Sequence, residues 1–98
     1  MARFKVSGTA ALESLNLFVI AGDVTEGVIV PGMIVHIPVN SKLSIALPVE
    51  SVEYIRHSDR PEEIGLCIKY ADRSELDTWQ ALNIDSELIE VSESSQSS

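Results

Sequence analysis

Three glycines at a constant spacing constrain this chain more than any other feature of its sequence. Gly22, Gly27 and Gly32 recur every five residues in the stretch VIAGDVTEGVIVPGMIVHIP, residues 19–38, and β-branched or apolar residues fill most positions between them. Glycine adopts positive φ angles and lets a second backbone approach closely, so the spacing suits a strand that bends and turns repeatedly. We expect a strand, a turn at residues 25–27, a short strand, a turn at residues 31–32, and a third strand.

The remaining chain continues as short apolar runs separated by turn residues. We expect strands at residues 3–7, 17–24, 34–39, 43–47, 49–56, 64–70 and 88–91. The third and fourth of these are expected to pair across a two-residue turn at Asn40 and Ser41. Residues 9–16 fit either a helical turn or a lead into the next strand. The run LFVI at residues 17–20 is apolar on both faces, which indicates a central strand or a barrel wall buried by something else. The fold class predicted is all-β: a small, mainly antiparallel, closed or nearly closed β-barrel of six to seven strands.

Residues 74–82 break the strand pattern and predict one short helix near the C-terminus. Ser74 is a suitable N-cap, and Asp77 approximates its capping-box partner. Leu76, Trp79 and Leu82 then share one helical face. Two roles stay open for this face: it caps an open end of the barrel, or Trp79 anchors a partner protein.

The length of 98 residues fits one domain, which we place at residues 1–91, followed by a disordered, serine-rich tail at residues 92–98. The alternating start MARFKV does not read as a signal peptide, and no run approaches the ~18 apolar residues of a membrane span. Cys67, the single cysteine, sits in an apolar run and is expected to be a buried, inert thiol. These features favour a cytoplasmic protein without membrane contact.

The polar residues form no catalytic or metal-binding set. His36 lies within an expected strand, while His57, Ser58 and Asp59 are neighbours in one loop and do not make a triad, whose members must converge in space. Cys67 and the histidines lack the spacing of metal ligands, and no G-x-x-x-x-G-K-[ST] phosphate loop occurs. We therefore expect no enzyme, no cofactor and no metal.

A family resemblance appears in the glycine-rich stretch. GDVTEGVIVPGMIVHI resembles the G-x-V-x-x-G-x-[IV]-x-x-G-x-x-[VI] signature of the second domain of translational GTPases such as elongation factor Tu. VESVEYIR (residues 49–56) and EEIGLCIK (residues 62–69) are similar to later steps of that domain, so that the resemblance covers roughly residues 4–70. It implies a small β-barrel and an association with RNA or the ribosome, here without a GTPase domain in this chain. No motif here matches the surface residues by which that family contacts aminoacyl-tRNA or the ribosome.

The net charge of −8 argues against phosphate-rich partners, since an acidic surface repels nucleic acid. Arg56 and Arg60 are a candidate basic patch for RNA or a phosphorylated ligand, or else solvated arginines that offset neighbouring acids. Together with Trp79 they are the candidate interaction residues. The function expected is a non-catalytic module for protein–protein interaction or assembly, with an unidentified partner or a second copy of itself; the alternative is an RNA- or ribosome-associated module.

Overall fold

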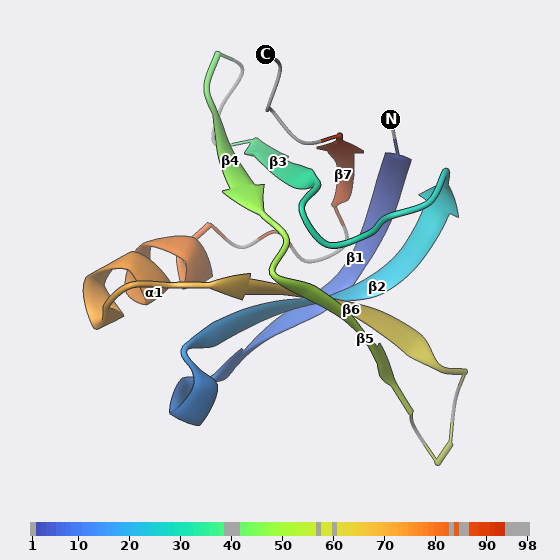
Figure 1. Ribbon diagram of the computed structural model, residues 1–98, viewed down its shortest axis with the longest axis horizontal. Helices are drawn as coiled ribbons and strands as arrows, with labels where there is room; N and C mark the ends of the chain where they lie inside the picture. The colour runs from blue at the N-terminus through green and yellow to red at the C-terminus, as the bar shows by residue number, and fades with distance from the viewer. Residues whose placement is uncertain are drawn as a thin grey trace.

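The fold is a single seven-stranded antiparallel sheet with one helix. The computed structural model describes residues 2–38, 42–56, 58–59, 61–82, 84 and 87–93. Its elements are β1 (Ala2–Leu12), the 3₁₀ helix η1 (Glu13–Leu15), β2 (Leu17–Glu26), β3 (Ile34–Pro38), β4 (Ser44–Pro48), β5 (Ser51–Ile55), β6 (Glu63–Lys69), α1 (Arg73–Gln80) and β7 (Leu88–Ser92) (Figure 1). The predicted all-β class is confirmed.

The sheet is not closed, so the predicted closure into a barrel is wrong. Its strand order is β4-β3-β7-β1-β2-β6-β5, and among the described residues no ladder joins the two outermost strands, β4 and β5. These strands are instead connected directly by the chain. At the connection the Val49 amide donates to the Met33 carbonyl (2.9 Å), and the Glu50 amide donates to the Cys67 carbonyl (2.7 Å). Val49 is thus bonded to the residue before β3, and Glu50, one residue later, is bonded to β6. The chain passes from one half of the sheet to the other without pairing of β4 with β5.

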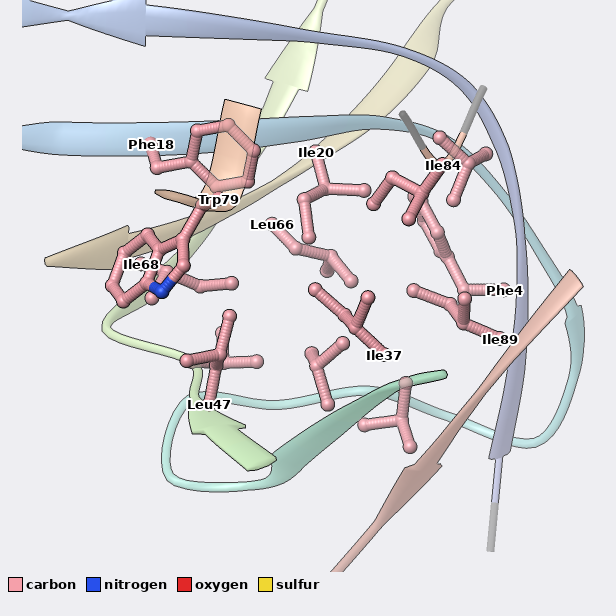
Figure 2. Close-up of a cluster of buried hydrophobic side chains, with 14 of the residues drawn as sticks. Phe4, Phe18, Ile20, Ile37, Leu47, Leu66, Ile68, Trp79, Ile84 and Ile89 are labelled. Carbon is pink, nitrogen blue, oxygen red and sulfur yellow. The ribbon is translucent and has the colours of Figure 1, made fainter. Parts of the chain in front are cut away.

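β1 is the strand shared by both halves of the sheet. Its first residues pair with β7, whereas nearly its whole length pairs with β2. The β1–β2 register shifts twice, between Arg3 and Phe4 and between Val6 and Gly8. Such bulges bend a strand and increase its twist, which turns the β4-β3-β7 half to face the β2-β6-β5 half. Figure 2 shows the result: Ile20 and Leu66 from one half meet Ile37 and Leu47 from the other.

The glycines of residues 19–38 serve both purposes predicted for them. A Cβ atom at Gly22 would lie 1.9 Å from the carbonyl oxygen of Lys5, so the paired strands β1 and β2 approach each other here to a distance that only glycine allows. Gly27 and Gly32 have φ angles of 78° and 97°, in the region that L side chains rarely adopt. The short strand expected between these two turns is absent: residues 28–30 form a loop, in which the Met33 amide donates to the Val30 carbonyl (3.3 Å).

Most of the other predicted strands are present with shifted ends. Residues 9–12 belong to β1, and the 3₁₀ helix η1 then leads to Asn16, whose φ of 55° closes the hairpin. The expected hairpin of β3 and β4 is confirmed, with Ile34 opposite Pro48, although its turn lies outside the described residues. Alternation with Ile45 and Leu47 predicts that Leu43 faces the core, but Leu43 is largely exposed. β7 includes Ser92, and the predicted disorder of residues 94–98 lies outside the described chain.

α1 begins two residues earlier than predicted, with Asp72 as its N-cap instead of Ser74. The Asp72 carboxylate accepts from the Glu75 amide (2.9 Å), and the Glu75 carboxylate accepts from the Ala71 amide (2.8 Å). These two bonds satisfy amides at the helix start in a reciprocal arrangement similar to a capping box. Asp72 is preferred because Glu75 stands three residues after it, whereas Ser74 would be paired with the shorter Asp77.

We expect Gly22→Ala to lower the free energy of unfolding by about 2 kcal/mol or more, because the added methyl group meets the Lys5 backbone and no flexible atom can give way. Gly8→Ala is the matched control. Gly8 also lies in the β1–β2 ladder, but a Cβ atom there would meet nothing within 4 Å. Urea denaturation measures both variants. Equal stability of the two variants would contradict the close approach of the β1 and β2 backbones at Gly22.

Gly27→Val and Gly32→Val should each cost at least ~1 kcal/mol of stability, since a β-branched residue is strained at positive φ. Gly32→Asn should cost less than Gly32→Val, because asparagine tolerates positive φ better. The same denaturation assay compares them, and a neutral valine variant would show that the turn at that site is wrong.

Candidate interaction surface

Trp79, the first candidate interaction residue, lies in the core. Its side chain is only 6% exposed, and its ring packs on Phe18 of β2 with centroids 5.7 Å apart (Figure 2). Leu76 is fully buried beside it, and Leu82 packs against the same core cluster. The apolar face of α1 thus points into the core. This agrees with the capping role, and not with the partner-binding role, that the sequence left open for the helix. A partner would have to open the core to contact the indole ring.

Arg56 and Arg60, the other two candidates, are not brought together with Trp79. Arg56 follows β5, and its side chain is 89% exposed, with Nε 3.3 Å from a Glu62 carboxylate oxygen. Arg60 and the neighbouring His57 lie outside the described residues. The end of β5 that precedes Arg56 and helix α1 lie on opposite sides of the molecule (Figure 1). Arg56 and Glu62 thus form a solvent-exposed ion pair, and such a pair contributes little to stability.

His36 takes part in a polar contact on the surface of the sheet. Its Nε2 atom lies 2.7 Å from the Ser92 hydroxyl oxygen, across the β3–β7 ladder. An open groove of about 500 Å³ adjoins it, lined by His36, Pro38, Ser44, Leu88, Ile89 and Glu90. A serine–histidine pair needs a third group to orient the ring before it can act as a nucleophile and base. Within the described chain, nothing holds the other ring nitrogen, and no group of three metal-ligating side chains occurs.

The loop formed by residues 27–33, here called the valine loop, presents apolar side chains on a fixed backbone. Val28 is 74% exposed and Val30 is 50% exposed. Ile29, between them, is buried in the core, as is Met33 at the end of the loop. The sequence predicts a short strand here, and the run of three β-branched residues, Val28, Ile29 and Val30, between two glycines was the available signal for an apolar segment.

Hydrogen bonds hold the valine loop in place. The Gly32 amide donates to the Val49 carbonyl (2.9 Å), and the Val30 amide donates to the Met33 sulfur (3.2 Å). A groove of about 540 Å³ runs along the loop, lined by Gly27, Val28, Val30, Pro31, Gly32, Met33 and Glu93. Among the described residues that line this groove, Glu93 alone carries a charged side chain. The groove therefore suits an apolar ligand group with a positive charge near it.

The second apolar surface is the side of β1, β2, β6 and β5 that points away from the core, here called the outer face. Along β2, Phe18 and Ile20 enter the core, so Leu17, Val19 and Ala21 lie on the outer face. Register places Ala10 and Cys67 on either side of Val19, and Gly65 beside Ala21. Val19 and Cys67 are buried without belonging to the core cluster. The two-sided apolar run predicted at residues 17–20 is thus found in β2, which is a central strand.

On the outer face, the absence of a side chain at Gly65 leaves room for two neighbouring side chains. A Cβ atom at Gly65 would lie 3.0 Å from Ile55 Cδ1 and 3.1 Å from Val19 Cγ1, so these two side chains occupy the space above the glycine. Ala10 is exposed, and Leu17, Ala21 and Ile55 are half-buried. Cys67 is a buried free thiol, as predicted. Val19, Gly65 and Cys67 are thus already buried within the chain, and register places the exposed Glu53 beside Gly65 on the same face.

Comparisons with known proteins find no match to this chain, whether with family models, curated protein sequences or solved structures. None of the helices in the described part of the chain has the length and apolar character required to cross a membrane.

We expect Trp79→Ala to cost about 3 kcal/mol or more of stability, because the indole ring fills the core between α1 and β2. Tyr54→Ala, at a side chain that is 68% exposed, is the control and should change stability little. Trp79 is the only tryptophan, so intrinsic fluorescence reports on it alone. Blue-shifted, poorly quenched emission is expected; red-shifted, freely quenched emission would contradict the burial of the ring.

Proposed function

We propose that this protein is a non-catalytic binding module whose valine loop docks an apolar segment of a partner protein. The observation that carries the proposal is the exposure of Val28 and Val30 on a backbone anchored through Ile29 and Met33. Exposed apolar side chains held in a groove are typical of protein-interaction sites. A loop that is already ordered loses little conformational entropy when a partner binds, which favours affinity.

Charge defines the partner segment further. Glu93 lines the groove, and the whole chain carries a net charge of −8. An acidic surface attracts and orients a basic ligand, so we expect an apolar anchor residue with a lysine or arginine beside it. A cytoplasmic location belongs to the same proposal, since Cys67 is a free thiol and the chain has no second cysteine with which to form an internal disulfide.

The second candidate is an RNA- or ribosome-associated module related to the second domain of translational GTPases. It is supported by the glycine signature, whose Gly27 and Gly32 occupy turns at positive φ. The same net charge of −8 weighs against it, because binding to phosphates requires a basic surface. We therefore rank it below protein binding.

Selection from a peptide display library tests the proposal. The immobilised protein should enrich peptides with an apolar residue next to a basic one, and Val28→Asp and Val30→Asp should each weaken their binding at least tenfold. Leu88→Asp is the matched control, since it places the same charge at another exposed apolar residue away from the valine loop, and it should bind as the wild type does. Circular dichroism establishes that each variant is folded.

Two outcomes would overturn the assignment to protein binding. One is enrichment of no peptide, or of peptides that bind all three variants equally well. The other is binding to single-stranded RNA, measured by fluorescence anisotropy, that weakens steeply as salt is added, which would favour the second candidate.

A further inference from the structure

We propose that β5 accepts an extended segment of a partner protein as an additional strand of the sheet, and that this segment has an apolar–basic–apolar sequence at its centre. This goes beyond the proposed function, because β5 and the valine loop share no residue. Three observations support it: the unpaired side of β5, the absence of features that protect such an edge, and the charge and exposure of the β5 side chains.

The unpaired side of β5 is the first observation. β5 (Ser51–Ile55) is one of the two outermost strands, and in the described part of the chain it pairs only with β6. An edge strand presents a row of backbone N–H and C=O groups on its unpaired side. Among the described residues, no hydrogen bond reaches that side of β5. An extended backbone satisfies a whole row of such groups, as when a peptide adds a strand to a sheet. The β5 edge therefore fits an extended segment better than a helix.

The two edges of the sheet differ in how they are protected. Proteins discourage strand addition by placing prolines, lysines or bulges on an edge strand. β4 ends in Pro48, which has no amide hydrogen to donate. β5 contains neither proline nor lysine, and its register with β6 from Ser51 to Ile55 has no shift. β5 is thus the edge that is open to a further strand.

Glu53, at the centre of β5, specifies the charge of the added strand. Glu53 is exposed, and the residue opposite it on β6 is Gly65, which has no side chain. Its diagonal neighbour on β6 is a second acid, Glu63, and Arg56, beyond the end of β5, is paired with Glu62 (3.3 Å). Within the described chain, Glu53 makes no ion pair. A lysine or arginine opposite Glu53 on the added strand gives this carboxylate a cross-strand partner of opposite charge.

Val52 and Tyr54 flank Glu53 and specify the residues on either side of the basic one. They lie on the other face of β5, where Val52 is half-buried against the core and Tyr54 is 68% exposed. A β-branched or aromatic side chain opposite Tyr54 covers part of its ring and forms a favourable cross-strand pair. The resulting pattern, apolar–basic–apolar, is the same in both chain directions, so it holds for a parallel and for an antiparallel segment.

A different protein fits the β5 edge better than a second copy of this chain. Antiparallel pairing of two β5 strands over their full length places Glu53 opposite Glu53, and like charges directly opposite each other are destabilising. The contact is short, because β5 has only five residues, and an unstructured peptide loses conformational entropy when it binds. We therefore expect an isolated peptide to bind with a dissociation constant on the order of 100 μM.

Methylation of the peptide backbone tests strand addition. The probe is a fluorescently labelled peptide with blocked ends, in which threonine, valine, lysine, valine and threonine follow one another. One N-methylated form lacks the amide hydrogens of both valines, and the other lacks that of the lysine. Neighbouring residues of a strand form hydrogen bonds to opposite sides, so one methylated form should bind like the unmethylated peptide and the other at least tenfold more weakly. Fluorescence anisotropy measures binding to the Val28→Asp variant, in which the valine loop no longer competes for the peptide.

Exchange of charge at Glu53 tests the expected pairing. In the same Val28→Asp background, Glu53→Lys should weaken binding of the lysine peptide about fivefold, because an attractive cross-strand pair becomes a repulsive one. A peptide with glutamate in place of the lysine should bind the Glu53→Lys variant as tightly as the lysine peptide binds Glu53. Glu90→Lys is the matched control: it makes the same change in net charge at an exposed residue of β7, and it should leave both affinities within twofold.

Several outcomes would overturn the proposal. One is the absence of binding at protein concentrations up to about 1 mM, well above the expected dissociation constant. Another is equal binding of the two methylated peptides, and a third is an effect of Glu53→Lys no larger than that of Glu90→Lys. Binding to the wild type that is lost in Val28→Asp would place the contact at the valine loop instead, so this proposal and the proposed function can fail separately.

Discussion

The structure depends on the close approach of β1 and β2, where the backbone of Lys5 lies against the α-carbon of Gly22. Because no side chain separates the strands at this point, β1 can bend between its two bulges and pair with β7 on one side and β2 on the other. β1 pairs with a strand of each half of the sheet, and the core lies between the two halves. A larger residue at position 22 would push β1 away from β2, and the core contacts depend on these two strands being adjacent.

The core explains why the apolar surfaces of this protein are candidates for function. Phe18 and Trp79 pack against each other, so α1 completes the core with a residue that sequence alone could equally assign to the surface. Ile29 and Met33 anchor the valine loop to the same core. The apolar side chains that remain accessible, on the valine loop and on the outer face, are therefore not needed to bury this core. Their positions, on different elements, are set by the core.

Charge on this protein is organised at two scales. Locally, Arg73 bridges η1 and α1, with nitrogens 3.2 Å from the carboxylates of Glu13 and Asp77, and the hydrogen bond to Glu13 is the main cause that raises the pKa of the Arg73 guanidinium. This side chain is exposed and charged at any physiological pH, so its two ion pairs contribute little to stability and do not act as a pH switch. Globally, the net charge of −8 opposes the binding of phosphates.

The sequence by itself determined the local features. Glycine turns, the short strands, the antiparallel β3–β4 hairpin, the single helix and the two-sided apolar run in β2 follow from backbone geometry and from the period of neighbouring residues. Tertiary structure decided what depends on distant residues. Whether β4 and β5 pair, whether residues 28–30 form a strand, and whether Trp79 points inward are settled by which segments are near each other in space. A strand needs a neighbouring strand to pair with, and among the described residues no ladder includes residues 28–30, so this run of β-branched residues forms an anchored loop instead.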